Sequence, residues 1–297
     1  MLGSIPEARE VGWTIYSVPN PGTTDPDEVR QMAATGGGTA RRNLLLIKDD
    51  LETPATHQWS VGAGRKLRSD LAINVDYLDQ RVRDVYVTLL LNRGSDRFTT
   101  NYGDITVWDD FGDARYRALL VSLTYDRRPT RVSVAYTLGK AESEFGRTSD
   151  SNYPDTATYT MQRSEGDERH RLVVSGLTRL PFGLETSAIA IVASPRPFLV
   201  TTGIDDARQN GTQDNWPDGI RTHRRDGWEH WYRTLDLRLS KSLSTGRGRV
   251  SVIADIFNVF NTVNHAEYQP NASRPEYGEP AGDFARRQAQ VGVRYSF

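Results

Sequence analysis

The chain ends in Ala289-Gln290-Val291-Gly292-Val293-Arg294-Tyr295-Ser296-Phe297, and this stretch decides the fold class. Alternate residues are apolar or aromatic, so an extended strand would gather them on one face. Its last two members are Tyr295 and Phe297, which ends the chain. Aromatic rings are enriched where a membrane meets water. The stretch therefore predicts a terminal β-strand with one apolar face and an aromatic end at a membrane interface.

The same two-residue period recurs along most of the chain, and long stretches with a helical period are hard to find. Short turns are expected at 68–70, 128–129, 181–183 and 244–248. Long polar segments are expected at about 92–114, 141–166, 194–230 and 259–283. The predicted strands are 57–67, 71–91, 115–126, 131–140, 168–180, 184–193, 231–243, 249–258 and 285–297. Short turns that alternate with long loops are typical of outer-membrane barrels, whose turns are periplasmic and loops extracellular.

The strand 231–243 shows how the two faces differ. Leu235, Leu237 and Leu239 share one face, and Asp236 and Arg238 share the other. Charged side chains suit a water-filled lumen and are costly against lipid. Strands of about 10 to 13 residues also fit a tilted membrane crossing better than a soluble sandwich. We therefore expect an all-β fold, an antiparallel transmembrane β-barrel that is partial, with about nine or ten strands of a larger barrel. A soluble β-sandwich binding module remains an alternative, because alternation alone does not separate the two.

The composition of the chain argues against several other classes of protein. The 297 residues include 37 basic and 38 acidic side chains, so the formal net charge of -1 offers no basic excess for nucleic acid. Cysteine is absent, which excludes disulfides, thiolate catalysis and cysteine-bound metals. No apolar run is long enough for a transmembrane helix. The mean hydropathy of -0.58 is compatible with a barrel, because lipid-facing and lumen-facing residues cancel in the average.

The beginning of the chain carries no targeting signal. The stretch Met1 to Glu10 lacks the apolar core and small-residue cleavage site of a secretory signal peptide. Since an outer-membrane protein needs such a signal, we expect the natural start to lie upstream. We expect residues 1–50 to form a loop-rich segment with room for one strand. Residues 51–297 are expected to form the C-terminal part of an outer-membrane barrel.

Several stretches, in a fixed order, resemble one family. Residues 53–62 (TPATHQWSVG) resemble the start of the barrel in Oar-like TonB-dependent receptors. Residues 167–171 (DERHR) with 180–183 (LPFG) resemble a hairpin of that family, 255–261 (DIFNVFN) its penultimate strand, and 286–297 its final strand. Each stretch is short, but their order, spacing and direction agree. The resemblance implies a receptor that takes up a ligand across the bacterial outer membrane.

The resemblance also implies partners. The terminal strand, through Val291, Val293, Tyr295 and Phe297, is similar to the sorting signal that the barrel-assembly machinery reads. Outer-membrane lipid is a further expected partner, as are an upstream plug domain and the TonB system if the protein is full-length. No nucleic acid is expected. The family's plug domain is missing and its full barrel has about 22 strands, so we expect a fragment. A self-contained small barrel acting as a pore or adhesin is a further alternative.

The third polar segment carries the expected ligand contacts. They are Trp216, His223, Trp228 and His230, which combine aromatic rings with polar nitrogen atoms. Long loops held by rigid strands are common binding surfaces, so we expect these side chains to meet a ligand on the extracellular side.

No motif predicts catalysis or a cofactor. The two histidines of this segment, with Asp226 and Glu229, offer donors for a divalent ion, but their spacing is not that of a metal site, and we expect no metal. The G-x-S-x-G elbow of hydrolases is absent. We therefore expect no enzyme, no catalytic residue and no cofactor. Gly62 and Gly64, two residues apart in a predicted strand, indicate close packing or curvature.

Overall fold

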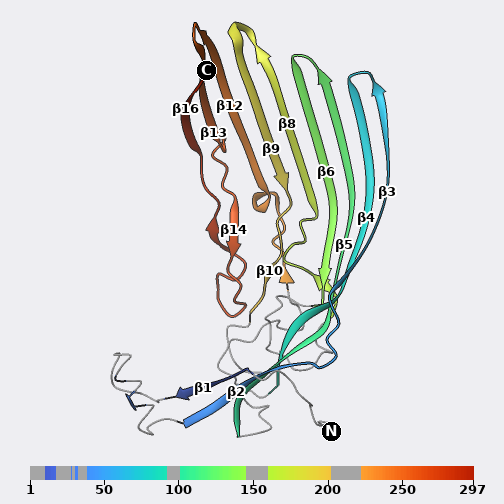
Figure 1. The fold of residues 1–297 in the computed structure, drawn as a ribbon, viewed down its shortest axis with the longest axis vertical. Coiled ribbons are helices and arrows are strands. Elements are labelled where there is room, and N and C mark those ends of the chain that lie inside the picture. The colour runs from blue at the N-terminus through green and yellow to red at the C-terminus, as the bar shows by residue number, and fades with distance from the viewer. Residues whose placement is uncertain are drawn as a thin grey trace.

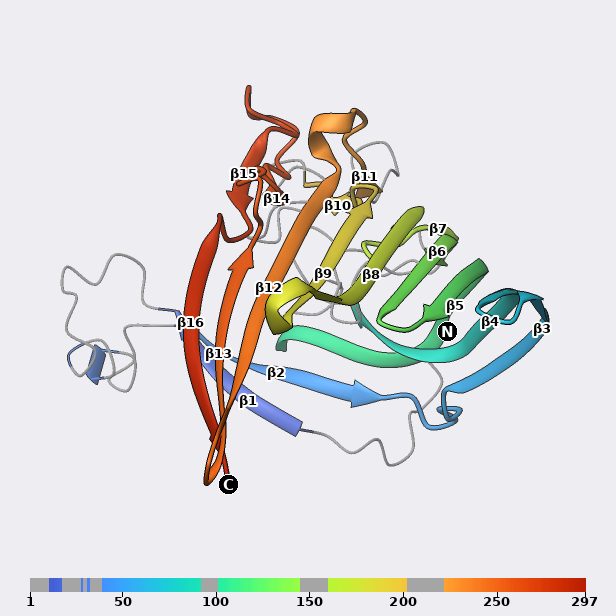
Figure 2. The ribbon, with the colours of Figure 1, turned by 90° about the horizontal axis from the view of Figure 1, so that it is seen from above.

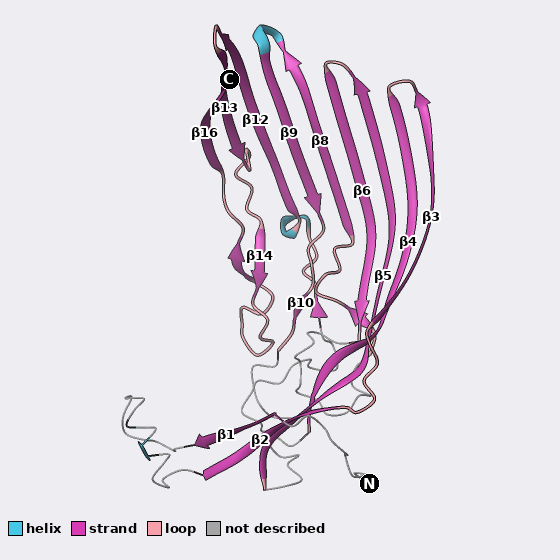
Figure 3. Ribbon diagram, viewed as in Figure 1, coloured by secondary structure: helices cyan, strands magenta, loops and turns pink. Residues whose placement is uncertain are grey.

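The computed structural model describes residues 11–17, 28, 31–32, 39–91, 101–144, 160–201 and 222–297. Its main feature is a wall of nine long strands, each hydrogen-bonded antiparallel to the next (Figure 1). In spatial order these are β3 (Ala55–Arg68), β4 (Leu71–Leu90), β5 (Tyr102–Arg127), β6 (Thr130–Ser143), β8 (His170–Leu180), β9 (Leu184–Ala193), β12 (Tyr232–Thr245), β13 (Gly248–Phe257) and β16 (Gln288–Ser296). Strands dominate the described residues (Figure 3), which confirms the predicted partial barrel.

Short turns join the strands at one end of the wall, and longer connections join them at the other (Figure 1). The turns are 69–70, 128–129, 246–247 and the 3-10 turn η3 (Pro181–Gly183). Phe182 and Gly183 have positive φ angles of 64° and 71°, a conformation that glycine adopts without steric cost. All four turns lie where the sequence predicted them. In an outer-membrane barrel this turn end is periplasmic and the loop end is extracellular.

The wall has an apolar face and a polar face. Strand register places Leu239, Ala254 and Val291 side by side on the face that we call the lipid face. Arg238, Asp255 and Gln290 are aligned on the opposite face, which we call the lumen face. Polar side chains of the lumen face line a hollow of about 840 Å³ near the turns, so this face is the concave one.

Side chains of the lipid face are exposed, whereas in a β-sandwich the apolar face of each sheet is buried in the core. Val291 and Val293 keep exposed fractions of 76% and 71%, and Phe297 is fully exposed. A second sheet packed against this face would cover these side chains. The soluble sandwich alternative is therefore wrong for this strand, and the barrel interpretation holds.

Both edges of the wall are unpaired among the described residues. There β3 pairs only with β4, and β16 pairs only with β13. Nine antiparallel strands give the first and last the same direction, and Figure 2 shows them at the two ends of a curved, open wall. Direct pairing of β3 with β16 would be parallel. Closure as an antiparallel barrel therefore needs an odd number of further strands.

Strand β5 begins at Tyr102, whereas the sequence analysis assigned 92–114 to a polar loop. After a bulge that follows Val82, β4 and β5 continue as a hairpin beyond the wall. Val87 and Leu89 are buried there and form a small apolar core. The prediction was wrong because charged residues interrupt the apolar ones in this stretch, and only the folded hairpin shows which of them face inward.

The described part of residues 1–50 contains two strands, where we expected room for one. They are β1 (Val11–Ser17) and β2 (Thr39–Ile47), which pair antiparallel with each other. Strand β2 also pairs in parallel with the loop-side part of β5, where Leu44 and Ile105 are buried. Sheet hydrogen bonds thus join this segment to the extended hairpin (Figure 1).

Short elements occupy the loop-side connections. These are β7 (Gln162–Arg163), β10 (Phe198–Leu199), β11 (Thr222–His223), the 3-10 turn η5 (Trp228–His230), β14 (His265–Tyr268) and β15 (Pro280–Asp283). Strand β10 pairs with β11, and β14 pairs with β15. Within the described residues, no helix is both long enough and apolar enough to span a membrane. The small hairpins form the site described next.

Two glycines let β3 and β4 approach closely. Gly62 lies opposite Asp76 and Gly64 opposite Asn74. A Cβ atom at these glycines would lie 1.9 Å from the Asp76 carboxylate and 2.2 Å from the Asn74 amide oxygen. The predicted role in close packing is confirmed, because any larger side chain would displace a polar neighbour.

Candidate ligand-binding site

A pocket of about 370 Å³ lies at the loop end of β8, β9 and β12. Its apolar lining comes from Ile191, Pro195, Pro197, Phe198, Tyr232, Tyr268 and Phe284. Its polar lining includes Glu168, Arg171, Ser194, Arg196, His230, His265 and Glu267. Apolar and aromatic walls with a few convergent polar groups are typical of small-molecule sites. The pocket is therefore the candidate site.

Aromatic rings hold the connections around this pocket together. The ring centroid of Phe198 is 5.5 Å from that of Tyr268 and 5.8 Å from that of His223. The hydroxyl of Tyr268 lies 3.2 Å from His230 Nδ1, and the hydroxyl of Tyr277 lies 3.1 Å from His223 Nδ1. We call these five residues the aromatic–histidine cluster. It brings together three segments that are far apart in sequence, around Phe198, His223–His230 and Tyr268–Tyr277, and so fixes the shape of the site.

One side of the pocket is charged. Arg171 Nη1 donates to Glu168 Oε1 at 2.9 Å, and Arg196 Nε donates to Glu168 Oε2 at 3.2 Å. Arg196 remains 63% exposed, so a ligand can reach its guanidinium group. On another side, His265 Nδ1 lies 2.8 Å from Asp283 Oδ1. The site can offer aromatic surface and cationic hydrogen-bond donors to the same ligand.

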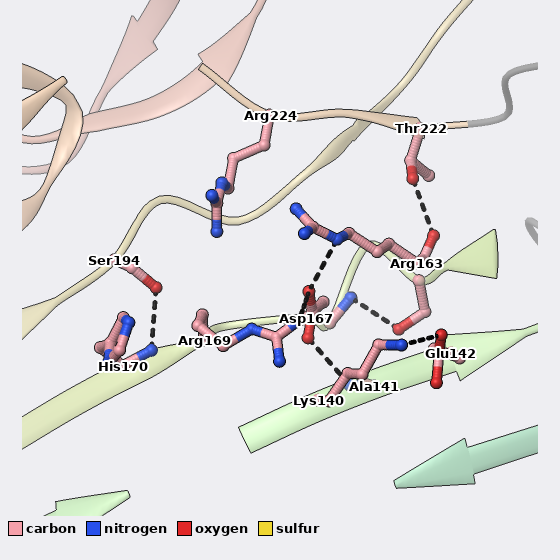
Figure 4. A network of polar contacts seen from close by, with 12 residues as sticks. Lys140, Ala141, Glu142, Arg163, Asp167, Arg169, His170, Ser194, Thr222 and Arg224 are labelled. Carbon is pink, nitrogen blue, oxygen red and sulfur yellow. Dashed lines mark hydrogen bonds and ion pairs between the residues drawn. The ribbon is translucent and has the colours of Figure 1, made fainter. Parts of the chain in front are cut away.

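Asp167 anchors the segment that carries Glu168 (Figure 4). Its side chain has no exposed surface, and Oδ1 accepts a hydrogen bond from the backbone N–H of Ala141 at 2.9 Å. Arg163 Nε and Arg169 Nη2 lie 3.7 and 3.6 Å from Oδ2. A buried carboxylate requires such compensation by hydrogen bonds and positive charge. This network explains why the DERHR stretch begins with an aspartate.

The neighbouring residues of that stretch connect strands. The backbone N–H of His170 donates to Ser194 Oγ at 3.0 Å, which joins the start of β8 to the end of β9 (Figure 4). The His170 ring lies between two aromatic rings, with its Nδ1 2.8 Å from the Tyr136 hydroxyl and its centroid 5.9 Å from that of Trp231. These contacts place the charged side of the pocket at the loop end of β8 and β9.

Two asparagines hold the hairpin that supplies Tyr268. Asn258 has a positive φ of 48°, which asparagine tolerates better than most residues. Its side chain accepts from the N–H of Thr262 and donates to the Thr262 carbonyl, both at 2.9 Å. Asn264 makes the same pair of bonds to the backbone of Arg233, at 2.6 and 2.9 Å. The asparagines of this region therefore set how the chain leaves β13 and returns beside β12.

Burial changes the titration of the pocket. It lowers the pKa of His230 below the usual value of 6.5, although the nearby Glu229 carboxylate acts in the opposite direction. Burial also raises the pKa of the Tyr268 and Tyr277 hydroxyls. At neutral pH the site therefore holds a neutral imidazole beside protonated phenols, which suits hydrogen bonding to a ligand.

The structure unites only part of the predicted contact set. His223 and His230 meet through the aromatic–histidine cluster. Trp228 lies outside it, with its ring centroid 5.2 Å from that of Trp231 and 4.8 Å from the guanidinium carbon of Arg233. Trp216 falls outside the described residues. Whether any of these side chains touches a ligand stays a prediction.

Sequence reasoning missed the residues that complete the pocket. They are Glu168, Arg171, Phe198, His265 and Tyr268, and Tyr277 packs against Phe198 beside the pocket. Most of them belong to different connections between strands. Because these connections are far apart in the sequence, no local pattern indicates that they lie close together in the fold. The available signal was the concentration of histidine and tyrosine between residues 265 and 277.

The four residues considered as ion ligands do not converge. Arg224 Nη2 donates to Asp226 Oδ1 at 3.1 Å, and Glu229 Oε1 lies 3.6 Å from His230 Nε2. In the parts of the chain that the structure describes, no group of three or more His, Asp or Glu side chains is arranged to hold a metal ion.

The residues of the predicted sorting strand share the lipid face. Val291, Val293, Tyr295 and Phe297 have exposed fractions of 76%, 71%, 52% and 102%. The rings of Tyr295 and Phe297 lie 6.1 Å apart at the turn end. An exposed apolar row that ends in paired aromatic rings fits a strand in contact with lipid at an interface.

Known proteins share this architecture. A search of the curated proteins gave no match. Among solved structures, the outer membrane transporter YddB from Escherichia coli is similar, with a TM-score of 0.60 and 14% identity over 84% of this chain and 34% of that chain. The FrpB iron transporter from Neisseria meningitidis has a TM-score of 0.52 and 13% identity, covering 84% of this chain and 32% of that chain. P. aeruginosa FpvA, solved bound to heterologous pyoverdines, has a TM-score of 0.50 and 9% identity, covering 97% and 30%.

These likenesses concern the fold, and the chain spans about a third of the length of each of the three structures. A family model described as "Outer membrane beta barrel domain" matches residues 8–220, which is more than half of the chain. The antiparallel wall, the exposed lipid face and the polar concave face agree with that match. The chain belongs to the outer membrane beta barrel domain family, and its place is the bacterial outer membrane.

Proposed function

We propose that this chain is the C-terminal barrel portion of a TonB-dependent outer-membrane receptor, which takes up a ligand captured by its extracellular loops. The observation that carries the proposal is the pocket at the loop end of a wall whose fold is that of outer-membrane transporters. In such a receptor, a plug domain inside the barrel would release the ligand when an inner-membrane partner supplies energy.

The open wall supports the proposal that the chain forms one part of a larger barrel. Its two edge strands run in the same direction, so they do not complete an antiparallel barrel by pairing with each other. The matched part of this chain covers only about a third of each similar structure. We propose that the remaining strands and the plug belong to sequence outside this chain.

Binding rather than catalysis is proposed for the pocket. Its carboxylate Glu168 is occupied by two arginines, and His265 is engaged by Asp283. These ion pairs fix the shape of the pocket, and the likeness of the fold to outer-membrane transporters favours ligand binding. The exposed Arg196 and the ring of Phe198 are better placed to hold a ligand than to transform it.

The test measures uptake by a bacterium that produces the protein from its natural gene context. The probes are a ferric siderophore, cobalamin, a maltodextrin and a peptide digest, each supplied at limiting concentration. Deletion of the gene should abolish uptake of one probe. Phe198→Ala or Tyr268→Ala should reduce that uptake about tenfold, because the loss of a buried aromatic contact costs more than 1 kcal/mol of binding. Phe260→Ala, an exposed ring outside the pocket, serves as the matched control.

The same experiment separates the rival functions. Uptake by a receptor should stop when the proton-motive force is dissipated. Entry of all small probes that persists without this force would instead identify a pore. A protein that supports the uptake of none of the probes, while its gene is needed for attachment to surfaces, would identify an adhesin.

A further inference from the structure

The lipid face of β4, β5 and β6 changes character at one level. Toward the turns it is apolar, with Tyr77, Leu119 and Leu138 as the last aligned members. Two residues further toward the loops, the aligned positions are Asp79, Arg117 and Lys140. The next aligned positions are Arg81, Arg115 and Glu142. Register places all of these side chains on the lipid face.

This level corresponds to the outer boundary of the hydrocarbon core. Arg117 precedes Arg127, the last residue of β5, by ten positions, and Lys140 follows Thr130, the first residue of β6, by ten. A tilted strand crosses the core in about 9–11 residues. The rings of Trp59 and Tyr77 lie 5.2 Å apart next to the same level, as interfacial aromatic residues do. The charged positions therefore lie where the headgroups of the outer leaflet begin.

We call these charged residues the rim cluster: Asp79, Arg81, Arg115, Arg117, Lys140 and Glu142. Arg115 holds Asp79 with two hydrogen bonds, of which the Nε–Oδ1 bond is 3.3 Å long. Arg117 Nη2 donates to Glu142 Oε2 at 3.0 Å, and Lys140 pairs with the other oxygen of Glu142. The carboxylates thereby fix the positions of the cations in advance.

Burial makes the exposed surface of this cluster positive. The side chains of Asp79 and Glu142 are only 5% and 15% exposed, whereas Arg81 is 51% exposed. Arg117 and Lys140 are each 34% exposed. Four cations face two covered carboxylates, so net positive charge remains. A positively charged surface beside lipid attracts anionic headgroups.

We propose that the rim cluster binds the phosphate groups of a phosphorylated glycolipid in the outer leaflet. Acyl chains would lie along the apolar side chains below Tyr77 and Leu138, and a phosphate would accept hydrogen bonds from the arginines above. Arginine suits this role because its guanidinium group matches phosphate geometry.

The experiment measures lipid binding by native mass spectrometry and by fluorescence titration of the purified chain in detergent. The probe is doubly phosphorylated lipid A, and its dephosphorylated form is the comparison. The double substitution Arg81→Gln with Lys140→Gln removes two exposed cations and leaves the Arg115–Asp79 and Arg117–Glu142 pairs intact. Each cation near a charged surface contributes about 1 kcal/mol, so the affinity for phosphorylated lipid A should fall about 30-fold.

Lys241→Gln is the matched control, since Lys241 lies on the same face at the turn end. It should change the affinity by less than about twofold. Equal binding of phosphorylated and dephosphorylated lipid A by the unaltered chain would overturn the proposal, and this comparison needs no variant to fold. Inorganic phosphate at millimolar concentration should not displace the lipid. If it competes as effectively as the lipid does, the site binds the free ion and the proposal is overturned.

Discussion

A single buried carboxylate, Asp167, joins the start of β8 to β6 and carries the charged side of the pocket with it. Replacing it by alanine removes the acceptor of the Ala141 N–H and leaves Arg163 and Arg169 without their counter-charge. We expect Asp167→Ala to lower the free energy of unfolding by about 2–3 kcal/mol. Urea unfolding in lipid vesicles, followed by tryptophan fluorescence, measures the change.

The control for this substitution is Asp226→Ala. The Asp226 side chain is 83% exposed and pairs with Arg224. An exposed ion pair contributes little, so the loss should stay below about 0.5 kcal/mol. Equal losses for the two variants would show that burial of Asp167 is not what stabilises the loop end.

His230 should make the pocket sensitive to acid. Burial lowers its folded-state pKa below 6.5, so the neutral form is favoured in the folded site. Its contribution to stability is fully present above about pH 6.5 and is lost as the pH falls through the lower folded-state value. We expect amide hydrogen exchange at residues 228–232 and 265–268, corrected for the intrinsic rate, to be faster near pH 5 than near pH 7.5. In His230→Gln this difference should disappear; its persistence would assign it to another group.

At this scale the sequence predicted His223 and His230 as ligand contacts, which stays a prediction, but it did not predict which residues surround them. His223 and His230 were predicted from their aromatic neighbours in the same segment. Their actual neighbours, Phe198 and Tyr268, come from other connections. No local pattern states which long loops lie side by side, because that depends on the order of the strands in the wall.

Across elements, one polar network ties the last three strands together. Arg238 donates to both oxygens of Asp255, at 2.6 and 2.9 Å, and Gln290 Nε2 donates to Asp255 at 2.9 Å. The Asp255 side chain is 7% exposed, so these bonds are shielded from water. A double-mutant cycle with Arg238→Ala and Asp255→Ala should give a coupling energy of about 1–3 kcal/mol.

An exposed pair of the same kind offers the comparison for this cycle. Arg179 and Glu185 face each other across β8 and β9 at 2.9 Å, with exposed side-chain fractions of 73% and 54%. Their coupling energy should be below about 1 kcal/mol, since solvent screens exposed pairs. Additive effects at the Arg238–Asp255 pair would contradict the interpretation that this shielded ion pair holds β12 to β13.

The terminal strand allows a prediction about assembly. Phe297→Ser removes the exposed aromatic group at the end of the lipid face and should lower the amount of protein in the outer-membrane fraction several-fold. Arg294→Ala changes a lumen-face residue of the same strand and should leave that amount nearly unchanged. Immunoblots of separated membranes provide the measurement, and equal loss for both variants would refute a signal specific to the lipid face.

Element boundaries were predictable where alternation was clean. In β12 and β13 the leucines and valines alternate with polar residues, and the predicted bounds differ from the observed ones by at most two residues. In β5 the stretch 102–114 alternates less clearly, because both faces of the extended hairpin meet protein or water rather than lipid. Contact with lipid requires apolar residues on one face of a strand, which gives a clear alternation in the sequence. This alternation is lost where the strand leaves the membrane.

For the whole molecule, the terminal residues and the regular sequence of short turns and long loops were sufficient to predict a partial barrel. The nine-strand wall and the position of all four turns agree with that expectation. The parallel pairing of β2 with β5 was not foreseen. A parallel pair joins strands distant in sequence and has no turn signal of its own.

The central claim is that the apolar face of the wall meets lipid. Because the chain contains no cysteine, single cysteines can carry a nitroxide spin label at successive positions 250–255 of β13 without a background signal. In lipid vesicles, labels at Val250, Val252 and Ala254 should be accessible to oxygen and protected from a water-soluble nickel complex, and labels at Ser251, Ile253 and Asp255 should show the reverse. Labels at Val250, Val252 and Ala254 that are inaccessible to both reagents would place this face inside a protein core and contradict the account.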